Sequence, residues 1–151
     1  MIDILCTPTG ASPIVIEALF PTSPERLFRA WTDPADLRQW FGRDPAHTSD
    51  VQIDLTEGGH WQISMVDGQN RLEGIYTSIK PHDFLSFTWA HIQIGDSGET
   101  RTPPSEVALE FTPKGAATRL VLTHREIQSE SGRIGVRDGW RNSFQALYNS
   151  L

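Results

Sequence analysis

The sequence predicts an α+β fold in which a curved antiparallel sheet of about seven strands wraps over one long C-terminal helix. Three observations carry this prediction. Apolar residues recur at helical spacing only near residues 24–41 and near the C-terminus, whereas residues 51–124 alternate with a period of two. Short turn signals separate the alternating runs, which is typical of strands in a meander. An antiparallel sheet needs one face covered, and the C-terminal helix is the long amphipathic element available for it.

The first strand and the first helix are predicted from residues 13–32. Residues 13–20 are rich in β-branched and aromatic side chains, which favours a strand. Ser23 followed by Pro24 is typical of a helix start, and Thr22 with Glu25 offers a capping box as an alternative. The apolar side chains of this helix fall on one face, namely Leu27, Phe28 and Trp31.

A second short helix is predicted directly after the first. Asp33 is expected to cap it, Leu37, Trp40 and Phe41 lie at helical spacing within it, and Gly42 is expected to end it. We expect Trp40 and Phe41 to anchor both short helices to the rest of the fold.

Six further strands are predicted in the alternating part of the chain. Asp67-Gly68 is a strong hairpin signal between two of them. The polar segment from Gly95 to Pro104 contains two prolines and is expected to be a long hairpin loop. The predicted strands are Val51–Leu55, Trp61–Met65, Arg71–Ile79, Phe84–Ile94, Val107–Phe111 and Leu120–His124.

The C-terminal helix is predicted from one continuous apolar stripe. Gly135 and Gly139 should weaken its first turns by about 1 kcal/mol each relative to alanine, so a late or frayed start is expected. Residues 1–12 lack apolar periodicity and are expected to form a mobile N-terminal segment before a single domain at 13–151. The stripe consists of Trp140, Phe144, Leu147, Tyr148 and Leu151.

Composition excludes several classes of protein. The chain has 151 residues, a net charge of −6 and one cysteine. The negative charge argues against nucleic acid and against an anionic membrane surface as partners. A single cysteine excludes an internal disulfide and a cysteine-based zinc site, and it suits a reducing compartment. With neither a spanning apolar run nor a secretory signal, we expect a cytoplasmic location.

Seven short motifs, in this order, resemble the family related to the C-terminal domain of the activator of heat-shock protein 90 ATPase, within the START-like or SRPBCC helix-grip superfamily. The resemblance covers residues 13–151. It implies a helix-grip (START-like, Bet v-like) fold with a cavity between sheet and helix, but it implies no reaction. The motifs are Pro24-Glu25-Arg26-Leu27-Phe28, Trp31-Thr32-Asp33-Pro34, Leu37-Arg38-Gln39-Trp40-Phe41-Gly42, Gly58-Gly59, Leu85-Ser86-Phe87-Thr88-Trp89, Thr118-Arg119-Leu120-Val121-Leu122-Thr123-His124 and Gly139-Trp140.

Apolar side chains of the strands and the terminal helix are the candidates for lining that cavity. The alternative for each is that it belongs to a filled core, since aromatic residues bury large areas. We predict a pocket of roughly 300–1,000 Å³. The candidate ligand-binding residues are Trp61, Ile63, Met65, Phe87, Trp89, Val107, Leu109, Leu122, Trp140 and Phe144.

His91 and His124 are the candidate catalytic residues, because both continue an alternating strand pattern. Either one inside the cavity could act as a general base or orient a ligand. Glu126, two residues after His124, is expected on the same strand face and could pair with it. The alternative for both histidines is a hydrogen-bonded or solvated position at a strand end. The spacing of His, Asp and Glu predicts no metal site, and no cofactor is predicted.

The function favoured by these observations is binding of a small, largely apolar molecule in an internal cavity, without catalysis. An enzyme of the cyclase or hydrolase kind, using His91 or His124, is the first alternative. A module that contacts a chaperone is the second, and a homodimer is left open. A cavity lined only by apolar groups favours binding, whereas a histidine reaching into it beside a carboxylate or a tyrosine favours the enzyme.

Overall fold

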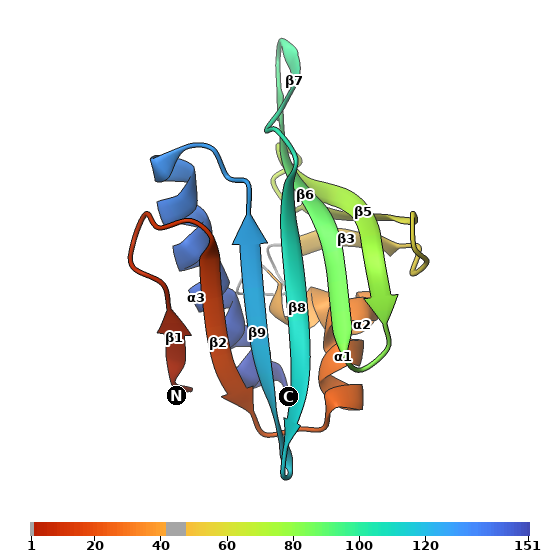
Figure 1. Cartoon of the computed structure of the whole chain (residues 1–151). Coiled ribbons are helices and arrows are strands. Elements are labelled where there is room, and N and C mark those ends of the chain that lie inside the picture. Colours follow the sequence, from red (N-terminus) through yellow and green to blue (C-terminus); the bar gives the residue numbers. More distant parts are fainter. Residues whose placement is uncertain (1, 42–47) are drawn as a thin grey trace.

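One antiparallel sheet contains all the strands of the part that the structure describes. The computed structural model describes residues 2–41 and 48–151. The strand order is β1-β2-β9-β8-β6-β5-β4-β3, and β7 pairs with β6 (Figure 1). The strands are β1 (Ile4–Cys6), β2 (Ile14–Phe20), β3 (Thr48–Ile53), β4 (His60–Met65), β5 (Asn70–Lys80), β6 (Phe84–Gly95), β7 (Gly98–Arg101), β8 (Ser105–Lys114) and β9 (Ala117–Arg125).

The three described helices are α1 (Pro24–Thr32), α2 (Pro34–Trp40) and α3 (Glu130–Ser150), and they lie on the same side of the sheet (Figure 1). The sheet curves, so that β3 lies behind the strands in the foreground of the figure. Alternate residues of β2, β8 and β9 are buried against the helices. The predicted wrapping of a curved sheet over a long C-terminal helix is confirmed.

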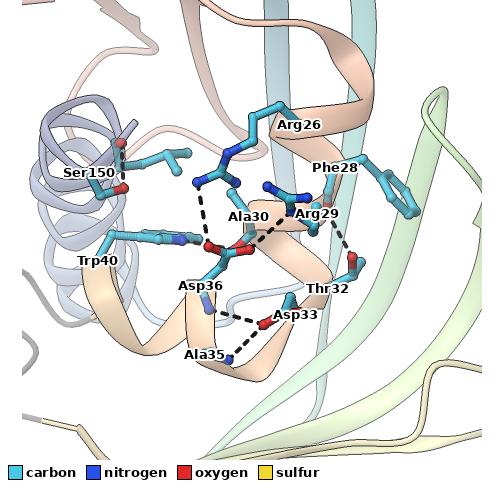
Figure 2. Close-up of polar contacts among 11 residues, drawn as sticks. Arg26, Phe28, Arg29, Ala30, Thr32, Asp33, Ala35, Asp36, Trp40 and Ser150 are labelled. Carbon is cyan, nitrogen blue, oxygen red and sulfur yellow. Dashed lines mark hydrogen bonds and ion pairs between the residues drawn. The ribbon is translucent and has the colours of Figure 1, made fainter.

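Side-chain caps fix where the two short helices begin, as predicted. Ser23 Oγ accepts a hydrogen bond from the Arg26 amide at 3.2 Å. Asp33 Oδ1 accepts from the amides of Ala35 and Asp36 at 2.9 and 3.2 Å, and thereby starts α2 directly after α1 (Figure 2). These acceptors satisfy amides that have no partner within the helix.

The junction between α1 and α2 is held by one buried indole and one shared carboxylate. Trp40 is fully buried, and its Nε1 donates to the Ala30 carbonyl at 2.9 Å (Figure 2). Asp36 faces both Arg26 and Arg29, each at 3.4 Å. The expected anchoring role of Trp40 therefore has a specific contact. Gly42, expected to end α2, lies outside the described residues.

Two segments contain strands that the sequence analysis did not predict. The N-terminal segment, expected to lack regular structure, contains β1, in which Leu5 is paired with Glu17 of β2. The expected hairpin loop at Gly95–Pro104 contains β7, which extends β6 into a hairpin projecting from the sheet (Figure 1). β1 has only three residues, too few for an alternating pattern to show, and all four residues of β7 are exposed, so it has no apolar face to reveal it.

α3 begins earlier than its glycines suggest. It runs from Glu130 to Ser150, with Gly135 and Gly139 inside it, and the expected late start is wrong. Ser129 Oγ accepts from the Gly132 amide at 3.0 Å and caps the helix. Arg133 Nε donates to the Gly10 carbonyl and joins the first turn to the N-terminal segment. Tertiary contacts of this kind offset the low helix propensity of glycine.

Candidate functional site

The space between α3, the short helices and the sheet contains a small apolar cavity of about 20 Å³. A cavity of this size has room for about one water molecule. The predicted internal pocket of 300–1,000 Å³ is therefore wrong in size. The cavity is lined by Trp31, Leu37, Phe41, Trp61, Ile63, Tyr76, Phe87, Trp89 and Trp140.

Interlocking aromatic rings are the reason that so little space remains. The ring of Trp89 lies 5.0 Å from that of Trp140 and 5.7 Å from that of Trp61, measured between centroids. Phe41 lies 6.2 Å from Trp89, and Trp31 lies 5.8 Å from Trp140. Tilted and edge-on pairs at these separations are favourable and fill the interior. Trp31 belongs to α1 and Phe41 directly follows α2, and the sequence analysis counted neither among the candidate ligand-binding residues.

A larger groove of about 290 Å³ lies between the first half of α3 and strands β4, β5 and β6. It shares the rings of Phe41, Trp89 and Trp140 with the small cavity, so these three side chains separate the two spaces. The walls of the groove are mainly apolar. Its other lining residues are Met65, Leu72, Gly135, Val136, Gly139 and Ser143.

Two glycines on α3 keep this groove open. Gly135 and Gly139 are four residues apart and therefore lie on one face of the helix. A Cβ atom built at either position would meet no atom of a described residue within 4 Å. Each glycine costs the helix about 0.5–1 kcal/mol relative to alanine. Packing does not require glycine at these two positions, because a side chain would meet no neighbouring atom. The open groove does require it, because a larger side chain would fill the space.

A second hollow, of about 320 Å³, adjoins the groove at Trp89 and Val136. It lies between the start of α3, the β9–α3 connection and the ends of β6 and β8. Its lining is more polar and includes His91, Ser105 and Glu126. The first half of α3 is thus flanked by two open hollows instead of covering one closed cavity.

The predicted ligand-binding residues divide into three groups. Trp61, Ile63, Phe87, Trp89 and Trp140 surround the small cavity, and the last two also line the groove. Met65 lines the groove alone. The remaining four side chains are fully buried in the packed core, namely Val107, Leu109, Leu122 and Phe144.

His124 lies inside the core, where both ring nitrogens have partners. Trp140 Nε1 donates to Nδ1 at 3.0 Å. Because Nδ1 accepts, the proton of the neutral ring is on Nε2, which donates to Ser105 Oγ at 2.7 Å. The Ser105 hydroxyl in turn donates to the Trp89 carbonyl at 3.3 Å. Each polar side-chain atom in this series of hydrogen bonds has a partner when the imidazole is neutral.

Burial lowers the pKa of His124 to about 3. A charged ring would also place an N–H on Nδ1 against the Trp140 N–H. The Nε2 tautomer makes His124 a donor to Ser105, so it does not draw a proton from that hydroxyl. The geometry is that of a structural histidine which holds the indole of Trp140 in place.

The other predicted polar residues stand apart from His124. Glu126 has φ +71°, which turns the chain out of β9, and its side chain is exposed. The expected pairing of Glu126 with His124 is therefore wrong. His91 lines the more polar hollow, and its Nε2 lies 2.8 Å from Asn70 Oδ1. The structure thus does not bring the two candidate catalytic histidines into one site.

Four residues that line the small cavity were not predicted. Trp31, Leu37 and Phe41 line the small cavity from α1, α2 and the end of α2, and Tyr76 lines it from β5. Their helical or alternating positions identified a buried face but not the space that the face encloses. Ser105 was missed as the partner of His124, because no motif links residues on neighbouring strands.

No cluster of three or more His, Cys, Asp or Glu side chains is placed to hold a metal ion among residues 2–41 and 48–151. Within the same ranges, no helix has the length and apolar character needed to cross a membrane.

Solved structures similar to this chain share its fold. Protein Ms6760 from Mycobacterium smegmatis is 20% identical with a TM-score of 0.78, over 100% of this chain and 97% of that one. Mll3558 from Rhizobium loti is 25% identical with a TM-score of 0.73, over 99% of each chain. CalU16 from Micromonospora echinospora is 22% identical with a TM-score of 0.70, over 99% of this chain and 85% of that one.

The sequence comparisons point the same way. No curated protein matches the sequence. The family model for activator of Hsp90 ATPase homolog 1-like proteins matches residues 21–151. This match spans both short helices, every strand from β3 onward and the whole of α3. The resemblance predicted from seven short motifs is thereby confirmed, and the chain belongs to the family of activator of Hsp90 ATPase homolog 1-like proteins.

Proposed function

We propose that the protein binds a small, largely apolar molecule in the groove between α3 and strands β4–β6. The groove has a volume of about 290 Å³ and walls of Met65, Leu72, Trp89, Val136 and Trp140. Small-molecule sites are concave, mostly apolar and commonly start at about 300 Å³. The observation that carries the proposal is the open space over Gly135 and Gly139. A better helix former at either position would stabilise α3, but its side chain would occupy the groove.

The hydrogen bonds around His124 support binding without catalysis. Trp140, a wall of the groove, is held by His124, which is held by Ser105. A rigid wall reduces the ordering cost of ligand binding. The enzyme alternative loses its better candidate base, because His124 is neutral, buried and a donor towards Ser105. Contact with a chaperone, a homodimer and a cytoplasmic location stay predictions from the sequence.

Filling the groove tests the proposal. Isopropenylnaphthalene is a rigid apolar probe, and its binding can be followed by the change in tryptophan fluorescence. Gly139→Leu places a branched side chain in the groove and should weaken binding at least about tenfold, roughly 1.4 kcal/mol. The same substitution should leave the protein folded, because leucine is a better helix former than glycine. Arg141→Leu adds a leucine to the exposed side of α3 and is the matched control.

Two outcomes are informative. Loss of binding in Gly139→Leu, with the parent affinity retained in Arg141→Leu, supports the groove as the site. Equal affinity in all three proteins, with the folded state confirmed by circular dichroism, places the probe elsewhere and contradicts the proposal.

A further inference from the structure

The small aromatic cavity is lined by two side chains that carry a hydrogen-bond donor, and the described residues 2–41 and 48–151 show no acceptor for either. Nε1 of Trp31 is fully enclosed and has no hydrogen-bond partner among these residues. The Tyr76 side chain is also buried, with 3% of its surface exposed. Burial alone raises the pKa of its phenol, with no hydrogen bond or charge contributing to the shift. Both side chains line the same cavity of about 20 Å³, one from α1 and one from β5.

Three other indoles of this region have a hydrogen-bond acceptor. Trp40, Trp61 and Trp140 each donate Nε1 to a defined acceptor, at 2.9, 3.1 and 3.0 Å. A buried polar group left without a partner is costly, so an unpaired one is expected to meet an acceptor that the protein itself does not supply. The cavity is an open space that both side chains line.

The size of the cavity limits what this acceptor can be. Room for about one water molecule admits one oxygen atom and excludes a ring. Any body attached to that oxygen must lie in the adjoining groove of about 290 Å³, on the other side of Phe41, Trp89 and Trp140. Because Trp140 is held by His124, an oxygen that enters the cavity from the groove would require the Phe41 or Trp89 ring to be displaced.

We propose that the ligand is an apolar carbonyl compound whose oxygen enters the small cavity and accepts hydrogen bonds from the Tyr76 hydroxyl and the Trp31 indole. The inference rests on the proposed function, since it names the class of molecule that the groove holds. A carbonyl oxygen accepts and does not donate, which suits two donors. A hydrocarbon of the same shape would leave both donors unpaired.

Two other arrangements compete with a carbonyl oxygen. A single water molecule would fit the volume and would remain when the ligand binds. The Trp31 ring also lies edge-on to Trp40, with 4.6 Å between centroids, so its N–H could point at that ring. Such contacts are weaker than a hydrogen bond to oxygen. Neither arrangement makes the protein prefer a ketone over a hydrocarbon of the same shape. The proposal does predict such a preference, and measuring it distinguishes the three cases.

The experiment compares two probes of the same shape in three proteins. Acetylnaphthalene carries a carbonyl where isopropenylnaphthalene carries a carbon–carbon double bond. Their dissociation constants are measured for the parent, for Tyr76→Phe and for the control Tyr148→Phe. Tyr76→Phe removes one oxygen and keeps the ring. The ratio of the two constants within each protein cancels general effects of the substitution on the groove.

We expect Tyr76→Phe to reduce the preference for acetylnaphthalene by about 2- to 12-fold, equivalent to about 0.5–1.5 kcal/mol, and Tyr148→Phe to leave it unchanged. The infrared carbonyl stretch of the bound ketone should move to higher frequency in Tyr76→Phe. An unchanged ratio and an unchanged stretch, with both probes bound, overturn the inference and leave the proposed function standing. Binding of neither probe overturns the proposed function itself.

Discussion

The indole of Trp140 and the imidazole of His124 are joined by a hydrogen bond in which the indole is the donor, with 3.0 Å between Nε1 and Nδ1. Both side chains are almost fully buried, with 3% and 1% of their surfaces exposed. The bond fixes the protonated nitrogen of the imidazole and the orientation of a ring that borders both the small cavity and the groove. His124, a candidate catalytic base in the sequence analysis, therefore has a structural role and holds the Trp140 indole in place.

The first prediction concerns the protonation of His124. With its pKa lowered to about 3, the ring should stay neutral from about pH 8 to about pH 5, and its NMR signals should not shift over that range. A midpoint near the usual value of about 6.5 would contradict the buried, hydrogen-bonded position.

The same shift predicts a dependence of stability on pH. Between about pH 6.5 and about pH 3 the unfolded chain binds a proton at His124 and the folded chain does not, so the free energy of unfolding falls as the pH falls. The contribution is about 1.4 kcal/mol per pH unit within that window. Urea denaturation at several pH values isolates this contribution when the parent is compared with His124→Gln, whose side chain keeps an acceptor and a donor but cannot titrate. The same pH dependence of the free energy of unfolding in both proteins would contradict the prediction.

A prediction on packing concerns Trp40. Trp40→Ala removes a fully buried indole, its contact with Trp31 and the hydrogen bond to the Ala30 carbonyl. It should lower the free energy of unfolding by about 3–5 kcal/mol. Leu19→Ala, at a side chain with 52% of its surface exposed, should change it by less than about 0.5 kcal/mol. Similar denaturation midpoints for the two variants would show that Trp40 does not anchor the helices.

Two glycines should respond in opposite ways to the same substitution. Gly135→Ala adds a methyl group in open space on a helix and should stabilise the protein by about 0.5–1 kcal/mol. A Cβ on Gly74 would clash with the Thr88 carbonyl oxygen and would lie 2.6 Å from Nε1 of Trp61, so Gly74→Ala should destabilise the protein by at least about 1–3 kcal/mol. Thermal melts of the two variants measure the contrast, and a stabilised Gly74→Ala would contradict it.

A fifth prediction concerns the N-terminal segment. Arg133 and Arg137 of α3 donate through Nε to the carbonyls of Gly10 and Thr7, both at 2.8 Å. Arg133→Ala should raise the hydrogen-exchange rate of the β1 amides roughly tenfold, because it removes a charged donor that holds the segment on the helix. Arg141→Ala, at an exposed arginine of the same helix, is the control. Equal rates in both variants would show that β1 is held by its pairing with β2 alone.

Local signals in the sequence predicted most of the fold. Ser23 and Asp33 mark the starts of α1 and α2 because capping depends on a few adjacent residues. The alternation of Val107 with Leu109, and of Leu120 with Leu122, identified buried strand faces in the same way. β1 and β7 were not predicted because a segment of three or four residues is too short to show a periodic pattern.

The site was predictable only in part, because periodicity tells which way a side chain points but not what it meets. Trp61, Phe87, Trp89 and Trp140 face the expected interior. The cavity they surround is small because Trp31 and Phe41 enter it from the short helices. The link between His124 and Ser105 depends on the register between β8 and β9, which no local signal specifies.

The most direct test of the central claim is to locate a bound apolar probe. Isopropenylnaphthalene is titrated into protein with labelled methyl groups, and ring-current shifts are read from the methyl spectrum. We predict large shifts at Met65, Leu72 and Val136, which line the groove, and none at Leu5 or Leu19, which are exposed elsewhere. Shifts confined to Leu5 and Leu19, or no shift at the groove at saturating probe, would contradict the account.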